Sequence, residues 1–312
     1  MRIALLYHGV LPVERYGGTE RVVVWLARGL AELGHEVVLI AGPGSKVPEA
    51  RLVPVDPQRA EHIDFDVRPH LPQGVEVLHA HRPLEPIEIP TLWTMHGNAR
   101  PGRRYPTANM VCLSAHHAQR HGTRAFVYNG LDPADYRFAA VKGDFDLFLG
   151  RLHSQKGWRW AVEGARRAER RLVVAGGWRP TLRPELRFVG TVGGWQKSDL
   201  LAEAACLWMP ALWDEPFGLT QIEALVSGTP VLGTRQGALP EIISPDVGAL
   251  GESLDHLVAL RPSLDRVAPE ACRARVLAHF SHRVMAEEYE RFYRQLISTG
   301  TLPDGKEVSS EK

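Results

Sequence analysis

The stretch MPALWDEPFGLTQIEALVSGTPVLGT, residues 209–234, predicts a strand, a loop, a helix and a second strand in that order. The predicted helix covers residues 219–227 and ends at Gly228. Glu215 precedes the helix, and Glu223 lies within it, about 6 Å along the axis at ~1.5 Å rise per residue. Because the free amides of a helix N-terminus attract anions, a ligand that carries both phosphate and hydroxyl groups fits this segment.

The composition indicates a globular protein of two domains. The chain has 312 residues, more than one ordinary hydrophobic core fills. Its 37 Lys and Arg residues balance 36 Asp and Glu residues, which argues against constitutive nucleic-acid binding. No stretch approaches the ~20 apolar residues of a membrane span, and no signal peptide is evident. Three widely spaced cysteines favour reduced core thiols. We therefore expect a cytoplasmic protein without an integral membrane segment.

Short apolar strands alternate with helices along both halves of the chain. In the first half, strands are expected at residues 1–7, 36–40, 76–79, 90–95, 111–114 and 125–128, with a helix at residues 20–33. In the second half, strands are expected at residues 147–150, 172–175, 187–189, 207–210 and 230–233, with helices at residues 158–171 and 198–205. Such alternation is typical of parallel sheets covered by helices on both faces.

We predict an α/β fold of two doubly wound Rossmann-like domains. The polar residues 129–143 are the expected linker, and the domains are placed at residues 1–138 and 139–281. Residues 282–298 follow as a long amphipathic helix, and residues 299–312 as a polar tail that we expect to be disordered. Neither first strand-to-helix turn contains G-x-G-x-x-G, which disfavours a dinucleotide cofactor. The crevice between the domains is the expected ligand site.

Seven short motifs resemble the retaining nucleotide-sugar glycosyltransferases of the two-domain B fold (GT-B), in particular those of family 4. They are GGTE at 17–20, HAH at 79–81, TMHG at 94–97, NGLD at 129–132, GRLHSQKG at 150–157, EPFGLTQIE at 215–223 and GALPEI at 237–242. Their order and spacing are specific, although each motif alone is short. The resemblance implies an acceptor-side first domain, a nucleotide-sugar-binding second domain and a helix at 282–298 that crosses back onto the first.

Two basic residues follow a predicted strand of the second domain. Arg151 and Lys156 flank the loop that leaves residues 147–150, at the edge where such sheets bind ligands. A departing diphosphate needs its negative charge matched, and Arg with Lys supplies a fork and a point charge. The alternative is a solvated basic loop. We predict diphosphate and donor-sugar binding by this pair and by the backbone at Phe217, Gly218, Leu219 and Thr220.

The resemblance assigns separate roles to the two glutamates. Glu223 matches the residue that binds the ribose diol, and Glu215 matches the one that faces the donor sugar. The structural alternatives are a surface helix residue for Glu223 and an N-terminal capping carboxylate for Glu215. Val192 and Lys197 resemble the region of the family that contacts the nucleotide base.

Two segments of the first domain complete the predicted site. Gly17 and Gly18 precede a helix, so their amides are expected to reach the diphosphate unless they form a simple turn. His96 follows the strand at 90–95, and the matching histidine of the family lies beside the anomeric centre. A purely structural histidine is the alternative. The predicted catalytic residues are His96, Glu215, Arg151 and Lys156.

The sequence predicts neither a metal nor a cofactor. His79 and His81 share one face of a strand, but no third ligand stands at a telling spacing, so we expect them to orient loops. D-x-D tripeptides occur at residues 64–66 and 144–146, as in metal-dependent A-fold glycosyltransferases. Such short strings arise by chance, and the second abuts the start of a strand.

These observations predict a metal-independent, retaining hexosyltransferase. It would move a sugar from a nucleoside diphosphate, such as UDP or GDP, to an unknown small-molecule, glycan or lipid-linked acceptor; retention is implied by the resemblance alone. One alternative is a glycosidase with Glu215 and Glu223 as acid and nucleophile. Others are a nucleotide-sugar 2-epimerase on the same fold and a non-catalytic sugar-nucleotide binder.

Overall fold

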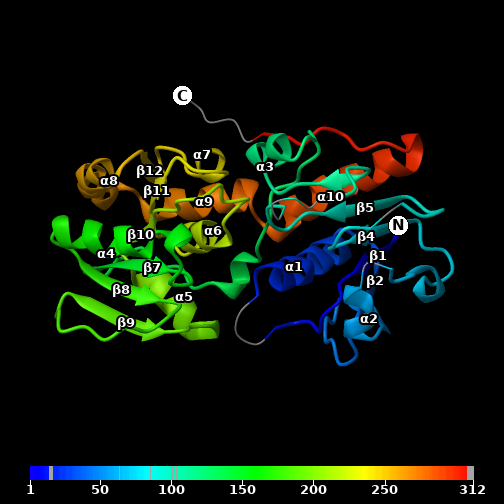
Figure 1. The fold of residues 1–312 in the computed structure, drawn as a ribbon, viewed down its shortest axis with the longest axis horizontal. Coiled ribbons are helices and arrows are strands. Elements are labelled where there is room, and N and C mark those ends of the chain that lie inside the picture. The colour runs from blue at the N-terminus through cyan, green and yellow to red at the C-terminus, as the bar shows by residue number, and fades with distance from the viewer. Residues whose placement is uncertain (14–16, 63, 85, 100–101, 103–104, 308–312) are drawn as a thin grey trace. The chain divides into compact units, whose positions relative to one another are not determined.

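The computed structural model describes residues 1–13, 17–62, 64–84, 86–99, 102 and 105–307 (Figure 1). The chain divides into two compact units. Unit 1 comprises Met1–Asp132 and Ser281–Glu307, and unit 2 comprises Pro133–Phe280. Each unit is built around a six-stranded parallel sheet. The predicted α/β fold with two Rossmann-like domains is confirmed.

The sheet of unit 1 has the strand order β3-β2-β1-β4-β5-β6. Its strands are β1 (Arg2–Leu6), β2 (Glu36–Ala41), β3 (Ala50–Pro54), β4 (Val77–Ala80), β5 (Thr91–Thr94) and β6 (Met110–Val111). All neighbouring strands run parallel. The order reverses between β1 and β4, so the loops after these strands diverge at the carboxyl edge of the sheet, where such folds bind ligands.

Unit 1 also holds the long C-terminal helix of the chain. Its helices are α1 (Gly18–Glu32), α2 (Pro57–Glu61), the 3-10 turn at Arg68–His70, α3 (Ala115–Arg120) and α10 (His282–Thr299). Helices α1 and α10 pack against each other (Figure 1). A side chain at Gly29 of α1 would overlap the backbone of His282, and Glu32 pairs with the His282 ring at 3.0 Å. Residues 281–307 therefore belong to the same unit as residues 1–132.

The sheet of unit 2 repeats this topology, with the order β12-β11-β10-β7-β8-β9. Its strands are β7 (Phe145–Leu149), β8 (Arg171–Ala175), β9 (Leu186–Gly190), β10 (Cys206–Met209), β11 (Val231–Thr234) and β12 (Gly248–Gly251). Again the strands are parallel. The order reverses between β7 and β10, which makes the loops after these two strands the expected ligand-binding loops.

Helices pack against the sheet of unit 2. They are α4 (Trp158–Arg167), α5 (Gly194–Glu203), α6 (Leu219–Val226), α7 (Leu239–Ile242), α8 (Leu254–Leu260) and α9 (Pro269–His279), with 3-10 turns at Pro133–Asp135, Ser154–Lys156 and Arg261–Arg266. Helices α4 and α8 pack against one face of the sheet, on the side chains of Phe148, Trp208 and Leu232. Because side chains alternate along a strand, the residues between them face the other side, where α5 and α6 contact the sheet.

A buried ion pair anchors β7. Asp146 and Arg261 are 0% and 1% exposed, and their side chains form two bonds of 2.6 and 2.8 Å. The Trp208 indole N–H donates to the same carboxylate at 2.8 Å. Asp146, the second aspartate of the 144–146 D-x-D tripeptide, is therefore engaged in the core.

Three differences from the sequence expectation concern strands. Strands β3 and β12 were not expected, and residues 125–128 form one bridge, Cys112↔Phe126, instead of a strand. The neighbouring segment, expected as a strand at residues 111–114, pairs with it only at Cys112, because Ser114 is already the N-cap residue of α3.

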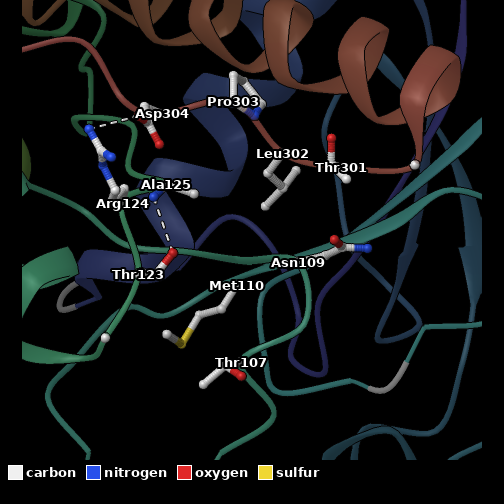
Figure 2. A pocket seen from close by; sticks show the side chains of 12 residues that line it. Thr107, Asn109, Met110, Thr123, Arg124, Ala125, Thr301, Leu302, Pro303 and Asp304 are labelled. Atoms are coloured by element: carbon white, nitrogen blue, oxygen red, sulfur yellow. Dashed lines mark hydrogen bonds and ion pairs between the residues drawn. The ribbon is translucent and has the colours of Figure 1, made fainter.

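The C-terminal segment packs on unit 1 as far as Glu307. Gly305 donates its N–H to the Arg124 carbonyl at 3.0 Å. Asp304 pairs with the Arg124 side chain at 3.1 Å (Figure 2). Pro303 is buried. This packing differs from the disorder expected for residues 299–312, of which 308–312 lie outside the described residues.

The structure gives two further results that bear on the sequence predictions. Within the described part of the chain, no helix is both long and apolar enough to cross a membrane. All three cysteines are buried and free, as predicted for core thiols.

Candidate functional site

Two loops of unit 2 meet at the point where its strand order reverses. The loop after β7 leads to Gly157, which has φ +70, and a Cβ there would overlap the carbonyl oxygen of Pro210 in the loop after β10. Only glycine satisfies both conditions without strain. Leu212 donates its N–H to the Gln155 carbonyl at 2.8 Å, which ties the loops together.

This junction brings Lys156 and Glu215 into contact. The Lys156 Nζ lies 2.6 Å from the Glu215 Oε2, and the Trp213 indole N–H donates to the same oxygen at 3.0 Å. The lysine ammonium also lies 4.8 Å from the centre of a Trp213 ring. Glu215 is only 6% exposed, so the carboxylate is held in one position. Arg151, in the same loop as Lys156, is exposed.

Gly237 packs closely against the backbone of Glu215. A Cβ on Gly237 would overlap the backbone nitrogen and oxygen of Glu215, and the φ of +60 favours glycine as well. The neighbouring Ala238 donates its N–H to the Glu215 carbonyl at 2.9 Å. The turn at residues 237–240 (GALP) therefore fixes the backbone from which the Glu215 side chain projects.

Helix α6 begins at Leu219, four residues after Glu215, with an open amino end. Gly218 is the N-cap residue with φ +86, and within the described residues no side chain caps this end. The Gln221 side-chain amide donates to the carbonyl of the buried Phe217. The backbone at Leu219 and Thr220, which are partly exposed, lies in the first turn, where N–H groups lack partners within a helix.

Glu223 lies on the next turn of α6 and is 2% exposed. The Tyr136 hydroxyl donates to its Oε1 at 2.7 Å, and the Lys197 Nζ lies 2.9 Å from the same atom. Lys197, predicted to contact a base, is thus held beside the predicted ribose residue. Val192, its predicted companion, is buried and lies in the loop that joins β9 to α5.

The predicted residues of unit 1 lie at the carboxyl edge of its sheet. Gly17 and Gly18 form the amino end of α1. His96 follows β5, and its Nε2 lies 2.9 Å from the Nδ1 of His81, which follows β4. Burial lowers the pKa of His96 to about 3 and holds the pKa of His81 well below its ordinary value, so both rings are neutral at pH 7.

His79 belongs to a separate polar network in the core. Its ring nitrogens lie 2.7 Å from the Tyr293 hydroxyl of α10 and 2.7 Å from the Thr94 hydroxyl. Thr94 in turn lies 2.8 Å from the Tyr289 hydroxyl. His79 therefore links the sheet to α10. Among the described residues, no group of three or more His, Cys, Asp or Glu side chains is arranged to hold a metal ion.

The structure brings together five of the predicted positions: Lys156 with Glu215, and Glu223 with Lys197, around the start of α6 at Gly218. It also adds Tyr136, for which the sequence offers no local signal because it stands 87 positions from Glu223. Gly237, the other addition, is the first residue of the GALPEI motif. Trp213 lies two residues before Glu215, and its position in a loop is its sequence signal.

A polar pocket of about 490 Å³ lies elsewhere on unit 1 (Figure 2). Thr107, Asn109 and Met110 line one side, and the C-terminal residues 300–304 line another. Thr107 and Asn109 precede β6, and Met110 is its first residue. None of the residues predicted from the motifs lines it.

Comparisons with known proteins match both halves of the chain. A family model described as Glycosyl transferases group 1 matches residues 146–261, and one described as Glycosyltransferase Family 4 matches residues 16–123. An uncharacterized glycosyltransferase of Methanocaldococcus jannaschii is 29% identical over 154 residues, 40% of this chain. The chain spans 39% of the length of that relative.

Solved structures extend the likeness over almost the whole chain. AviGT4, a glycosyltransferase involved in avilamycin A biosynthesis, is 30% identical, with 97% of this chain and 99% of that chain covered at a TM-score of 0.79. HepE of Anabaena, solved in complex with UDP-glucose, shares the fold at 15% identity and a TM-score of 0.65, with 96% of this chain and 100% of that chain covered.

Two Rossmann-like units, each built on a six-stranded parallel sheet, define a protein of the GT-B class. The chain belongs to the GT-B glycosyltransferases that carry family 4 and group 1 domains.

Proposed function

We propose that this chain transfers a sugar from a nucleoside-diphosphate sugar to an acceptor, with retention of anomeric configuration and without a metal ion. The observation that carries this proposal is the contact of Lys156 with Glu215 at the open amino end of α6. It combines a cation, helix amides and a fixed carboxylate at the point where the strand order reverses. These are the groups that a diphosphate bonded to a sugar requires.

The diphosphate is the leaving group, and its charge grows as the glycosidic bond breaks. Lys156, the exposed Arg151 and the backbone N–H groups at Phe217, Gly218, Leu219 and Thr220 stabilise that charge. Preorganised cations and dipoles contribute most where charge develops, so these groups supply what a metal supplies in other transferases. Glu215, fixed by Lys156 and Trp213, faces the sugar, where positive charge develops at the ring.

The nucleoside binds farther along α6. Glu223 accepts hydrogen bonds from the ribose hydroxyls, and Tyr136 and Lys197 hold its carboxylate in place. Val192 and Lys197 remain the proposed base contacts. UDP or GDP is the proposed carrier, and the fold shared with the UDP-glucose complex of HepE supports UDP.

Unit 1 contributes the groups that the resemblance implies. Gly17 and Gly18 supply amides to the diphosphate, and His96 binds the sugar. The transferred group is proposed to be a hexose, and the acceptor a small molecule, a glycan or a lipid-linked sugar. The cytoplasmic location stays a prediction.

Nucleoside diphosphates are expected to stabilise the protein against heat in the presence of EDTA. A ligand at 100 times its dissociation constant adds about 2.7 kcal/mol to the free energy of unfolding, which raises the melting temperature by several degrees. A panel of UDP, GDP, ADP and dTDP, each compared with its nucleoside, tests this. A thermal shift that requires Mn²⁺ or Mg²⁺ contradicts metal independence, and no shift with any diphosphate contradicts the proposed function.

Glu223→Gln is expected to raise the KM for the donor with kcat nearly unchanged. The ribose contacts are similar in the ground and transition states, so their loss weakens binding alone. Tyr136→Phe serves as the matched variant, because it removes one donor to the Glu223 Oε1 and keeps the carboxylate; its KM should rise less. Initial rates on one identified donor measure both effects. A fall mainly in kcat for Glu223→Gln overturns the ribose assignment.

A further inference from the structure

The two histidines at the carboxyl edge of the unit 1 sheet share one hydrogen bond. His81 and His96 follow the adjacent parallel strands β4 and β5, and their rings meet through the Nδ1 of His81 and the Nε2 of His96 at 2.9 Å. One hydrogen bond contains one proton. The ring that donates it therefore decides which nitrogen of His96 carries hydrogen.

Both rings are neutral, which leaves two arrangements. Burial keeps the pKa of each well below 7, so each imidazole has one N–H and one lone pair. In the first arrangement His81 donates from Nδ1 and His96 carries its hydrogen on its own Nδ1. In the second, His96 donates from Nε2 and His81 carries its hydrogen on Nε2.

The surroundings of His81 favour the first arrangement. Its Nε2 is buried and has no hydrogen-bond partner among the described residues. The neighbouring His79 ring stacks on it with a centroid distance of 4.4 Å, but both His79 nitrogens are engaged by Tyr293 and Thr94. The second arrangement would bury an N–H without an acceptor, which folded proteins rarely do. The first leaves only a lone pair unpaired.

We propose that His81 is a positioning residue that holds His96 as the Nδ1–H tautomer. In the glycosyl transfer proposed above, on which this role rests, His96 donates a hydrogen bond from Nδ1 to an oxygen of the bound sugar. The lone pair of its Nε2 is occupied by His81, and its Nδ1 carries hydrogen. Neither nitrogen is then free to take a proton from the acceptor, so His96 is not a general base.

Nitrogen-15 NMR of histidine-labelled full-length protein tests the tautomer without substrate. We expect a protonated Nδ1 and an unprotonated Nε2 for His96 at neutral pH. A protonated His96 Nε2 in the wild-type spectrum overturns the proposal, and this reading requires no variant.

Two variants separate positioning from general packing. His81→Phe keeps a ring but removes the donor, so the His96 nitrogens should move toward the averaged shifts of a tautomer mixture. His79→Phe, which keeps the stacked ring, should leave the His96 tautomer unchanged. Retention of the Nδ1–H tautomer in folded His81→Phe contradicts the positioning role.

Kinetics on an identified donor test the consequence for His96. His96→Asn keeps an N–H donor near the place of Nδ1, whereas His96→Ala removes it. We expect the asparagine variant to keep kcat within about tenfold and the alanine variant to lose about 10² or more. Equal losses contradict the donor role. If NMR shows the Nδ1–H tautomer of His96 but the protein transfers no sugar, the proposed function is wrong and the tautomer assignment remains valid.

Discussion

Glu215→Gln is expected to lower kcat by about 10² or more, with a smaller change in the KM for the donor. The carboxylate is fixed by Lys156 and the Trp213 indole, and its charge opposes the positive charge that develops on the sugar only during bond breaking. Lys156→Ala should resemble it, because charge on the departing diphosphate also grows in the transition state. Initial-rate kinetics of both variants measure the effect.

The contact between these two residues sharpens the test. Because the Lys156 and Glu215 side chains touch, the double variant should lose less activity than the product of the two single losses. Circular dichroism controls for folding. The assigned roles are reversed, and the proposed donor pose is wrong, if Glu215→Gln loses only affinity while Glu223→Gln loses mainly kcat.

Asp146→Asn is expected to lower the free energy of unfolding by about 3 kcal/mol, near the lower end of the cost of breaking a buried ion pair. The change leaves the Arg261 guanidinium buried without its main carboxylate. Asp265 keeps one ion pair with Arg261 at 2.7 Å, which limits the loss. Urea unfolding of the full chain, followed by circular dichroism, measures the change.

The other aspartate of the same D-x-D tripeptide supplies a matched control. Asp144 pairs with Arg171 at 2.6 Å, but these side chains are 73% and 64% exposed. Exposed pairs contribute about 0–1 kcal/mol, so Asp144→Asn should change stability little. Equal losses in the two variants would show that burial of the Asp146 pair does not set its contribution.

The sequence predicted those parts of the fold in which apolar residues run without interruption. Strands β1 and β10 contain buried apolar runs, at residues 3–6 and 206–209, and each strand was expected within one residue of its position. Strand β12 reads GALG, and β3 is a partly exposed edge strand. Neither shows the alternation or apolar run by which a strand is recognised, because edge position and glycine content weaken the pattern.

In the candidate site, too, some residues were predictable from the sequence and others were not. Lys156 and Glu215 were predictable because each follows the carboxyl end of a strand within a recognisable motif. Their partners arise from tertiary contacts: Tyr136 reaches Glu223 from the segment that opens unit 2, and Gly237 fits behind Glu215 only once the loops have folded. The bond between His81 and His96 likewise depends on the pairing of β4 with β5.

Product analysis with donors labelled in the sugar, run in EDTA with a panel of sugar and lipid-linked acceptors, tests the central claim most directly. We predict that the label moves from a nucleoside-diphosphate sugar to an acceptor while the nucleoside diphosphate is released. Label that returns as an epimer of the donor sugar, label that stays in unchanged donor with every acceptor, or transfer that stops in EDTA would contradict a metal-independent glycosyltransferase.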